Sequence, residues 1–262
     1  MLPFMRHFFF FSQIPLLALC ALVFVFGAAG SSAALVDSFE PGVHTKGKAT
    51  LPYRLLKPEK IERGKKYPIV LFLHGAGECG KDNQKQLHNG VGYLATPQMR
   101  AKHPCFILVP QCPSTSVAWR AGRSADAPLT TALALLDELI KKHPVDKQRV
   151  YISGLSMGGM GTFKALELRP RFFAAAIPIC GAGNAVAAKA YSRTPVWIFH
   201  GAKDNVVPPG SSKAIAEALK KASPKTPHKI TLFPNVGHNA WDPALRDPAT
   251  WEWLFAQKRG GS

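Results

Sequence analysis

Ser156 is the side chain whose surroundings most clearly suit a nucleophile. It lies at the centre of residues 154–158, which read Gly-Leu-Ser-Met-Gly and match the pattern G-x-S-x-G. An apolar run precedes this segment and a helical pattern follows it. In that context the pattern is typical of a sharp strand-to-helix turn that projects a serine hydroxyl from a sheet. We expect side chains at Gly154 and Gly158 to clash with the neighbouring strand and helix.

A serine hydroxyl needs a general base, and the base needs an orienting acid. Asp204 follows the apolar run 196–200, and His238 follows the apolar run 229–233. The order serine, aspartate, histidine is the one that α/β-hydrolases use. Because each residue follows a predicted strand, all three should reach the same edge of a sheet. We therefore predict Ser156 as nucleophile, His238 as general base and Asp204 as the acid that orients it.

Acyl transfer also requires donors for the oxyanion of its transition state. The backbone N–H of Met157 directly follows the predicted nucleophile. The second donor should come from the loop after the apolar run 67–74, where we choose the N–H of Ala76, between two glycines. His74 is expected to be structural. Trp241 follows His238 closely and is expected to line the acyl or alcohol pocket, with a core aromatic residue as the alternative.

Metal and cofactor motifs are not found. The sequence has no H-E-x-x-H motif and no histidine–cysteine cluster at zinc spacing. The glycine-rich segment 75–80 lacks the register of a dinucleotide fingerprint. The expected chemistry therefore uses neither a metal nor a cofactor.

Apolar runs alternate with helical patterns along the chain, which predicts an α/β fold with a mostly parallel central sheet flanked by helices. Runs without polar alternation indicate strands buried on both faces. The predicted strands are 49–56, 67–74, 106–110, 149–153, 174–179, 196–200 and 229–233. The predicted helices are 128–142, 157–168, 211–221 and 250–257.

The N-terminus has the order of a secretory signal peptide. Arg6 and His7 precede a long apolar stretch whose residues 14–29 carry no charge, and small residues follow up to Ala34. We predict a signal peptide over residues 1–34 and a single catalytic domain over residues 35–262. An uncleaved membrane anchor is the alternative. Export would place the protein outside the cell or in the periplasm.

Four cysteines follow the predicted signal peptide, at positions 79, 105, 112 and 180. An oxidising compartment favours disulfides. We therefore expect at least one disulfide, with structural or buried thiols as the alternative, and the spacing does not choose among the pairings.

The composition favours a folded protein with a basic surface. Of 262 residues, 47% are hydrophobic and 19% are charged, which excludes a disordered tail protein. The formal net charge is +17, but the basic residues are scattered and no nucleic-acid-binding motif occurs. We expect no nucleic-acid partner. A basic surface would suit an ester substrate carried on an anionic polymer, and a membrane only if the N-terminal segment stays uncleaved.

Several segments together resemble a known group of enzymes. These are LPYRLLKP, YPIVLFLHGAGE, DNQKQL, VPQCP, GLSMGG, IFHGAKDNVVP and GHNAWD. They are similar to secreted α/β-hydrolases of the carboxylesterase, feruloyl esterase and polyhydroxybutyrate-depolymerase-like group, some of which are labelled peptidases of the prolyl oligopeptidase superfamily. The resemblance spans roughly residues 51–255. Cys79 departs from it, because a charged residue is expected there.

The resemblance implies an α/β-hydrolase fold without a large cap and a triad of Ser156, Asp204 and His238. It also implies main-chain oxyanion donors near Ala76 and Met157. The favoured function is a serine hydrolase of small acyl or aryl esters, or of esters on polysaccharide. A serine peptidase and a non-catalytic exported binding protein are the alternatives. The chain leaves no room for a propeller domain, and the intact triad residues disfavour a purely binding role.

Overall fold

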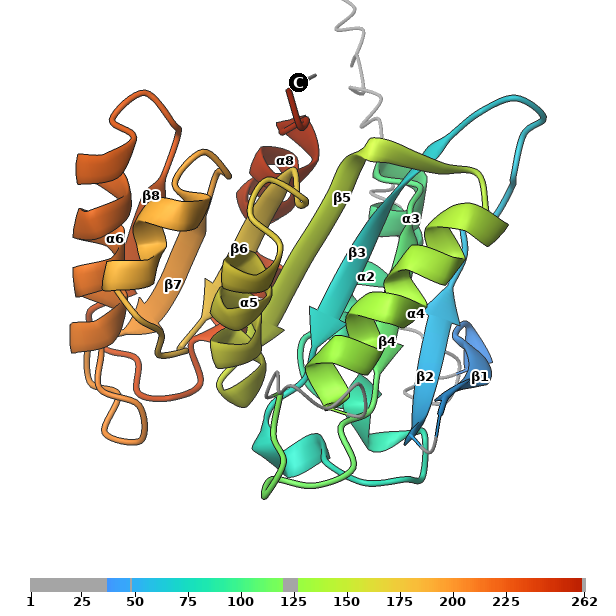
Figure 1. The fold of residues 1–262 in the computed structure, drawn as a ribbon, viewed down its shortest axis with the longest axis horizontal. Coiled ribbons are helices and arrows are strands. Elements are labelled where there is room, and N and C mark those ends of the chain that lie inside the picture. Colours follow the sequence, from blue (N-terminus) through green and yellow to red (C-terminus); the bar gives the residue numbers. More distant parts are fainter. Residues whose placement is uncertain (1–36, 48, 120–126, 261–262) are drawn as a thin grey trace, which may run out of the picture.

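The computed structural model describes residues 37–47, 49–119 and 127–260. In this part of the chain, eight strands form one sheet in the order β1-β2-β4-β3-β5-β6-β7-β8 (Figure 1). β1 and β2 pair antiparallel and so do β2 and β4, whereas the pairs from β4 through β8 are parallel. The strands are β1 Glu40–Lys46, β2 Ala49–Leu56, β3 Tyr67–Leu73, β4 Phe106–Pro110, β5 Val145–Leu155, β6 Ala175–Ile179, β7 Trp197–Gly201 and β8 Lys229–Phe233.

Helices cover both faces of the sheet, which confirms the predicted α/β-hydrolase fold. One face carries α4 Pro128–Lys142, α5 Met157–Leu168 and α6 Gly210–Ala222. The opposite face carries α2 Val91–Leu94, α3 Pro97–Lys102, α7 Trp241–Arg246 and α8 Pro248–Ala256. Within the described ranges, three short 3₁₀ segments lie in the connections, namely η1 Ala76–Glu78, η2 Lys85–Leu87 and η3 Val186–Tyr191.

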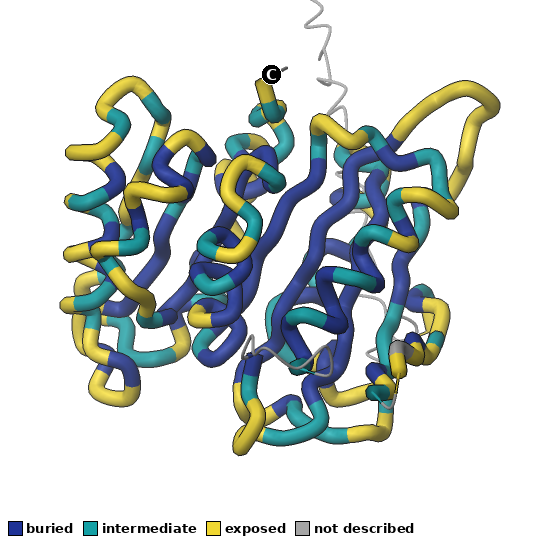
Figure 2. The backbone as a smooth tube through the Cα atoms, viewed as in Figure 1, coloured by how far each residue is buried: buried dark blue, intermediate teal, exposed yellow. Residues whose placement is uncertain are grey.

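The strand β3 shows why the central runs are apolar without interruption. All seven of its residues are buried. Ile69, Leu71 and Leu73 face the core under α4 and α5, whereas Val70 and Phe72 face the core under α2 and α8. Because successive side chains of a strand point to opposite faces, a strand covered on both sides needs apolar residues throughout. Figure 2 shows this buried centre, with exposed residues at the ends of the elements.

Most predicted elements are present, and the differences have local causes. β1 was not predicted, because its sequence EPGVHTK has little apolar alternation and it is the outer strand of the sheet. β5 starts at Val145, four residues before the predicted strand, because its polar first residues continue the chain in extended form before the buried part. α7 and the shorter helices are too short for a periodic pattern to reveal them.

The expected disulfide is absent from the described residues. Cys79, Cys105, Cys112 and Cys180 are free thiols, and all but Cys79 are buried. Burial raises the pKa of Cys105, Cys112 and Cys180 to about 12, so these thiols remain protonated. Small buried thiols of this kind pack as apolar core side chains, which corrects the prediction from the compartment.

The predicted signal peptide over residues 1–34 lies outside the described residues. Among the helices that the structure does describe, none has the length and apolar character required to span a bilayer.

Candidate active site

Ser156 occupies the sharp turn between β5 and α5. β5 ends at Leu155 and α5 begins at Met157, so this serine alone joins the two elements. Its backbone has φ 54° and ψ −117°, a strained conformation for a residue with a side chain. The N–H of Ser156 donates a 2.9 Å hydrogen bond to the carbonyl oxygen of Ile179, at the end of β6. This hydrogen bond to the neighbouring strand helps to hold the turn in place.

The two glycines that flank Ser156 are sterically required, as predicted. A Cβ at Gly154 would lie 2.8 Å from the carbonyl oxygen of Leu73. A Cβ at Gly158 would overlap that same oxygen and would lie 2.7 Å from the carbonyl oxygen of His74. Neither neighbour can move aside, because both oxygens belong to the backbone at the end of β3. The turn thus needs glycine at both positions.

Hydrogen bonds connect the loop after β7 to the loop after β8, and this connection brings Asp204 close to His238. The N–H of Ala202 donates to the carbonyl oxygen of Phe233 at 2.9 Å, and the N–H of Lys203 donates to that of Val236 at 3.0 Å. A Cβ at Gly201 would overlap the backbone of the β8 loop. The absence of a side chain at this position therefore allows the loops to touch.

The structure brings Ser156, His238 and Asp204 into one hydrogen-bonded chain. His238 Nδ1 lies 2.8 Å from Asp204 Oδ2, and His238 Nε2 lies 2.8 Å from Ser156 Oγ. Because an ionised carboxylate only accepts hydrogen bonds, Nδ1 carries the proton and Nε2 presents its lone pair to the serine hydroxyl. The Asp204 side chain is fully buried, whereas 20% of the His238 side chain is exposed. This geometry is suited to removing a proton from Ser156.

Asp204 is held as a carboxylate. Burial opposes its ionisation, but hydrogen bonds from His238 and from the backbone N–H groups of Val207 and Val206 outweigh burial and lower the pKa of Asp204. Both backbone groups donate to Oδ1 at 2.9 Å. Oδ2 is thereby left for the histidine.

A second histidine, His200, contacts the same carboxylate from inside the protein. Its Nε2 lies 3.2 Å from Asp204 Oδ2 and 2.8 Å from the carbonyl oxygen of Val207. Both neighbours are acceptors, so Nε2 carries a proton. Its Nδ1 lies 2.8 Å from the hydroxyl of Ser212, on α6. The sequence analysis did not single out His200, although its place as the last residue of an apolar run was a signal.

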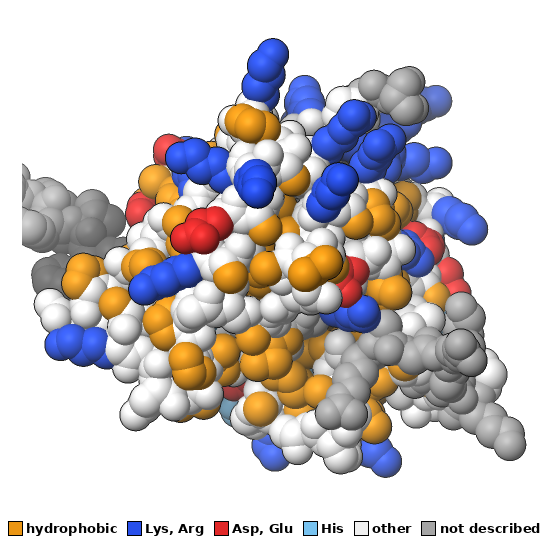
Figure 3. Space-filling view, turned by 60° about the vertical axis from the view of Figure 1, so that its left-hand side comes forward, with side chains coloured by type: hydrophobic (Ala, Val, Ile, Leu, Met, Phe, Trp, Pro, Cys, Tyr) orange, Lys and Arg blue, Asp and Glu red, His pale blue; other side chains and the backbone are white. Residues whose placement is uncertain are grey.

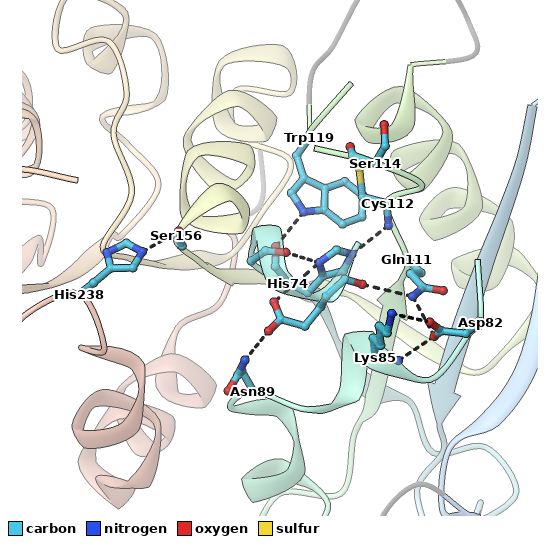
Figure 4. Close-up of polar contacts among 12 residues, drawn as sticks. His74, Asp82, Lys85, Asn89, Gln111, Cys112, Ser114, Trp119, Ser156 and His238 are labelled. Atoms are coloured by element: carbon cyan, nitrogen blue, oxygen red, sulfur yellow. Dashed lines mark hydrogen bonds and ion pairs between the residues drawn. The ribbon is translucent and has the colours of Figure 1, made fainter. Parts of the chain in front are cut away.

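His74 supports the loop that contains Ala76 (Figure 4). The backbone N–H of Cys112 donates to His74 Nε2 at 2.9 Å, so Nδ1 carries the proton and donates to the carbonyl oxygen of Gly75 at 2.6 Å. The indole N–H of Trp119 donates to the carbonyl oxygen of His74 at 2.9 Å. His74 is therefore structural, as expected. It fixes the backbone on both sides of the turn.

Further polar contacts hold the next turn of this loop. Glu78 is buried, and its carboxylate accepts a hydrogen bond from the Asn89 side-chain amide. Gln111, at the end of β4, donates to the carbonyl oxygen of Glu78 at 3.2 Å and to Asp82 at 3.0 Å. Asp82 also accepts from the N–H groups of Gln84 and Lys85. Side chains from three segments thus fix the loop.

Ala76 and Met157 stand at the starts of helical turns. Ala76 is the first residue of η1 and Met157 is the first residue of α5. The N–H groups of first-turn residues have no acceptor within their own helix. Gly75 lies against Leu155, the residue before the serine, so the two turns are neighbours. That Ala76 and Met157 supply the oxyanion donors stays a prediction.

Comparison with known proteins agrees with this arrangement. Residues 92–245, more than half of the chain, match the dienelactone hydrolase family. This chain belongs to the dienelactone hydrolase family. A rice protein (Oryza sativa subsp. japonica) named as a probable carboxylesterase is 24% identical over 212 residues, which cover 71% of this chain and 87% of that protein.

Two further relatives are longer than this chain. The bifunctional acetylxylan esterase/xylanase of Neocallimastix patriciarum is 28% identical over 141 residues, which cover 53% of this chain and 20% of that enzyme. The crystal structure of a thermostable esterase is 34% identical with a TM-score of 0.80, and the match covers 86% of this chain and 64% of that one. The chain thus spans a fifth of the first relative and less than two thirds of the second.

An acylaminoacyl peptidase shares the fold. It has a TM-score of 0.62 at 18% identity, over 86% of this chain and 43% of that one. At this identity the likeness shows the α/β-hydrolase fold alone.

Trp241 contacts the predicted base directly. Its ring is perpendicular to the His238 imidazole, with the ring centroids 5.5 Å apart. Trp241 is only partly buried, and it begins α7. The indole therefore lies beside the His238 imidazole.

Cys180, Asp204 and His238 place donor atoms within 4.8 Å of one another, close enough to hold a metal ion. The lone pair of His238 Nε2 already faces the hydroxyl of Ser156. Asp204 and His238 are also bonded to each other. The donor set is therefore better suited to the hydrogen-bonded chain than to a metal site.

The burial of His74 predicts a pH-dependent loss of stability. Burial lowers the pKa of His74 from 6.5 to about 4. The unfolded chain therefore binds this proton first as the pH falls. The contribution of neutral His74 is complete above pH 6.5 and is lost as the pH falls toward 4, by about 3 kcal/mol in the free energy of unfolding. Urea unfolding at several pH values should show this slope, and His74→Gln should flatten it.

Other histidines serve as the background in that measurement. His103, His143 and His228 also have lowered pKa values and change stability in the same direction. The difference between the wild-type and variant curves isolates His74. Parallel curves between pH 4 and 6.5 would contradict the prediction.

Proposed function

We propose that this protein is a serine carboxylic ester hydrolase that acts through an acyl-enzyme intermediate. The observation that carries the proposal is the hydrogen-bonded chain from Ser156 through His238 to Asp204, which starts at a strained turn. Membership of the dienelactone hydrolase family and the esterase names of its relatives support the same class. No cofactor is needed for this chemistry.

The first half of the reaction forms the acyl-enzyme. His238 Nε2 takes the hydroxyl proton as Ser156 Oγ attacks the ester carbonyl carbon. The N–H groups of Ala76 and Met157 stabilise the resulting oxyanion. When the intermediate collapses, the carbon–oxygen bond to the alcohol breaks and His238 gives the proton to the leaving alkoxide. Asp204 stabilises the imidazolium that exists between these two proton transfers.

The second half releases the acid. A water molecule takes the place of the alcohol, and His238 removes a proton from it as it attacks the acyl carbon. Collapse of the second tetrahedral intermediate breaks the bond to Ser156 Oγ, which recovers its proton from His238. The products are one alcohol and one carboxylic acid, and the enzyme returns to its starting state.

We infer that the substrates are small acyl or aryl esters, including esters carried on polysaccharide. One relative is named an acetylxylan esterase and another a carboxylesterase. Ser156 is partly exposed at the edge of the sheet, and no cap domain was predicted from the sequence. An ester on a long chain could therefore approach the serine from the solvent.

The protein is also proposed to be exported, on the residue pattern of its N-terminus. N-terminal sequencing of the protein recovered from the culture medium or periplasm should find a start near residue 35. Recovery of the intact N-terminus in the membrane fraction would instead favour the anchor.

The proposed activity is tested with a substrate panel. The panel contains short and long p-nitrophenyl esters, a feruloyl ester, acetylated xylan and a prolyl p-nitroanilide, each with Ser156→Ala as control. We expect ester turnover that disappears in the variant, and covalent labelling of Ser156 by a serine-directed phosphonate. Cleavage of the anilide alone would assign the protein to the peptidases. Absence of both turnover and labelling would overturn a catalytic role.

Trp241→Ala tests whether the indole lines the substrate pocket. Removing a side chain that contacts both His238 and the substrate should lower kcat/KM by about tenfold and shift the preferred acyl length. The measurement is kcat/KM across p-nitrophenyl esters of two to twelve carbons, with Trp253→Phe as an aromatic control on α8. An unchanged chain-length preference would leave Trp241 as a packing residue only.

A further inference from the structure

A basic cavity lies at the edge of the sheet opposite Ser156. Its volume is about 680 Å³, and it is bounded by residues just before β6 and β7, by the first half of β5 and by the segment after α8. Four of its lining residues are cationic: Arg171, Arg193, Lys258 and Arg259. No acidic residue is among the described residues that line it. We call this the amino-edge cavity.

The cations of the amino-edge cavity are not neutralised within the fold. Arg171, Arg193 and Lys258 form no salt bridge with another described residue, and the guanidinium group of Arg259 donates to the carbonyl oxygen of Phe172 at 3.4 Å. The nearby acid Asp146 is engaged by Arg149 and attracts Lys258 only at longer range. Like charges around one hollow repel one another, so a bound anion would relieve that repulsion.

An unsatisfied hydroxyl lies in the same cavity lining. Thr194 is 2% exposed, and its Oγ1 has no hydrogen-bond partner in the described structure. The Gln148 side chain adds an exposed amide nearby. Buried polar groups usually have a partner. Thr194 and Gln148 offer neutral hydrogen-bonding groups beside the cations, as recognition of a hydroxyl-bearing ligand requires.

The basic surface continues beyond the amino-edge cavity. Arg259 also lines a neighbouring cavity of about 320 Å³, together with Lys141 and Lys147. The one acid among the lining residues there, Asp137, accepts hydrogen bonds from both terminal guanidinium nitrogens of Arg169 at 2.7 Å. Figure 3 shows Lys and Arg side chains gathered in the upper part of one face of the molecule, with fewer of them lower down. Cationic side chains therefore line both cavities, which suits a ligand with repeated negative charges.

We propose that the amino-edge cavity binds the carboxylate groups of an acidic polysaccharide. Planar guanidinium groups match carboxylates with two parallel hydrogen bonds. A hollow lined by cations and neutral hydrogen-bonding groups admits a sugar chain more readily than the flat surface of a bilayer. β5 between Gln148 and Leu155 spans roughly 20 Å at about 3.3 Å per residue, so the cavity is remote from Ser156. It therefore holds the polymer without touching the reacting ester.

The inference depends on the proposed function in one respect, because it takes the bound polymer to carry the ester that Ser156 cleaves. Binding itself requires no turnover. The two ideas can therefore fail separately, and the test measures them separately.

Binding is measured with the full-length protein carrying Ser156→Ala, so that no substrate is consumed. Polygalacturonate is the probe, unsubstituted xylan is the neutral control, and duplex DNA and phosphatidylglycerol vesicles represent other polyanions. The cavity variant is Arg193→Gln with Lys258→Gln, two exposed side chains of the amino-edge cavity. Its charge-matched control is Lys213→Gln with Arg246→Gln, two exposed side chains that do not line it.

The expected result is salt-sensitive binding of polygalacturonate that the cavity variant weakens by about tenfold and the control variant leaves nearly unchanged. Equal weakening by both variants would show a general charge effect and would overturn the proposal. Tighter cavity-dependent binding of DNA or of vesicles would overturn the choice of ligand. Urea unfolding of both variants checks that the fold is intact.

Activity provides the second readout. With Ser156 restored, the cavity variant should hydrolyse a p-nitrophenyl ester at the wild-type rate, while its KM for an esterified polygalacturonate rises by about tenfold. Loss of activity on the small ester would contradict a site remote from the reaction. An inactive wild-type protein that still binds polygalacturonate through the cavity would refute the esterase proposal and leave the binding site standing.

Discussion

Replacing Asp204 by asparagine should lower kcat for a p-nitrophenyl ester by about 10³- to 10⁴-fold. The carboxylate of Asp204 accepts a hydrogen bond from His238 at 2.8 Å, and His200 Nε2 lies 3.2 Å from it. Both meet the same oxygen, Oδ2, while the backbone N–H groups of Val206 and Val207 occupy Oδ1. Every group around this carboxylate is therefore a donor.

An asparagine cannot satisfy these neighbours. If its oxygen stays with the two backbone groups, its NH₂ group faces His238 and His200. A donor opposite His238 Nδ1 favours the tautomer whose proton lies on Nε2. That tautomer presents a proton, and no lone pair, to Ser156, so the base is lost although the shape is preserved. The imidazolium of the transition state also loses its compensating charge.

Asp242→Asn is the matched control for this measurement. Asp242 lies four residues after His238, and its carboxylate accepts from the side chain of Asn239 at 2.8 Å, outside the hydrogen-bonded chain. We expect kcat within about twofold of the wild type for this variant. Urea unfolding should show that Asp204→Asn remains folded at the assay temperature. An Asp204→Asn enzyme with wild-type kcat would exclude Asp204 as the acid.

The contacts of Asp204 also show what could be predicted from the sequence. The order of serine, aspartate and histidine along the chain is visible, because each follows an apolar run that forms a strand. Their mutual distances are not visible. These depend on hydrogen bonds between the β7 and β8 loops and on the close approach at Gly201.

His200 shows why the partners of buried polar residues could not be predicted from the sequence. Its neighbours Ser212 and Asp204 lie on α6 and on the loop after β7, and no local pattern links them. The same is true of Glu78 and Asn89, which the sequence separates by a loop. Such partners are selected by tertiary packing, so a single sequence shows the candidates without their pairing.

The fold was predictable where its physical cause is local. Because helices cover both faces of the sheet at β3 and β4, every residue of these strands is buried and apolar, and both apolar runs were recognised in the sequence. β1 pairs only with β2 at the outside of the sheet, and Val43 within it is 64% exposed. A strand with one neighbour and little burial leaves no clear hydrophobic pattern. Thiol pairing is also non-local, and the expected disulfide was wrong.

The turn around Ser156, in contrast, could be predicted from the sequence, because the two glycines that its close packing requires are visible there. Gly154 and Gly158 were predicted to be required, and the structure shows that backbone atoms at the end of β3 fill the space of both side chains. The same carbonyl groups precede Gly75 and Ala76. Displacing them would therefore disturb the serine turn and the predicted oxyanion donor together.

Gly158→Ala should consequently destabilise the protein by about 3 kcal/mol or more. The new methyl group would overlap the carbonyl oxygen of Leu73 and lie 2.7 Å from that of His74. Relief requires β3 and α5 to separate, which opens the core between them. Gly210→Ala is the matched control, because Gly210 also lies in the first turn of a helix but has no atom within 4 Å of the position of a Cβ.

Urea unfolding of the two variants separates the steric effect from the general effect of replacing glycine. Gly210→Ala should change the free energy of unfolding by less than about 1 kcal/mol, because alanine restricts the unfolded chain without a clash. Gly158→Ala should also lose ester hydrolysis by more than about tenfold at a temperature where it remains folded, since the shift reaches Ala76. Equal stability of the two variants would mean that β3 shifts at little cost in free energy. The conclusion that backbone packing requires glycine at position 158 would then be wrong.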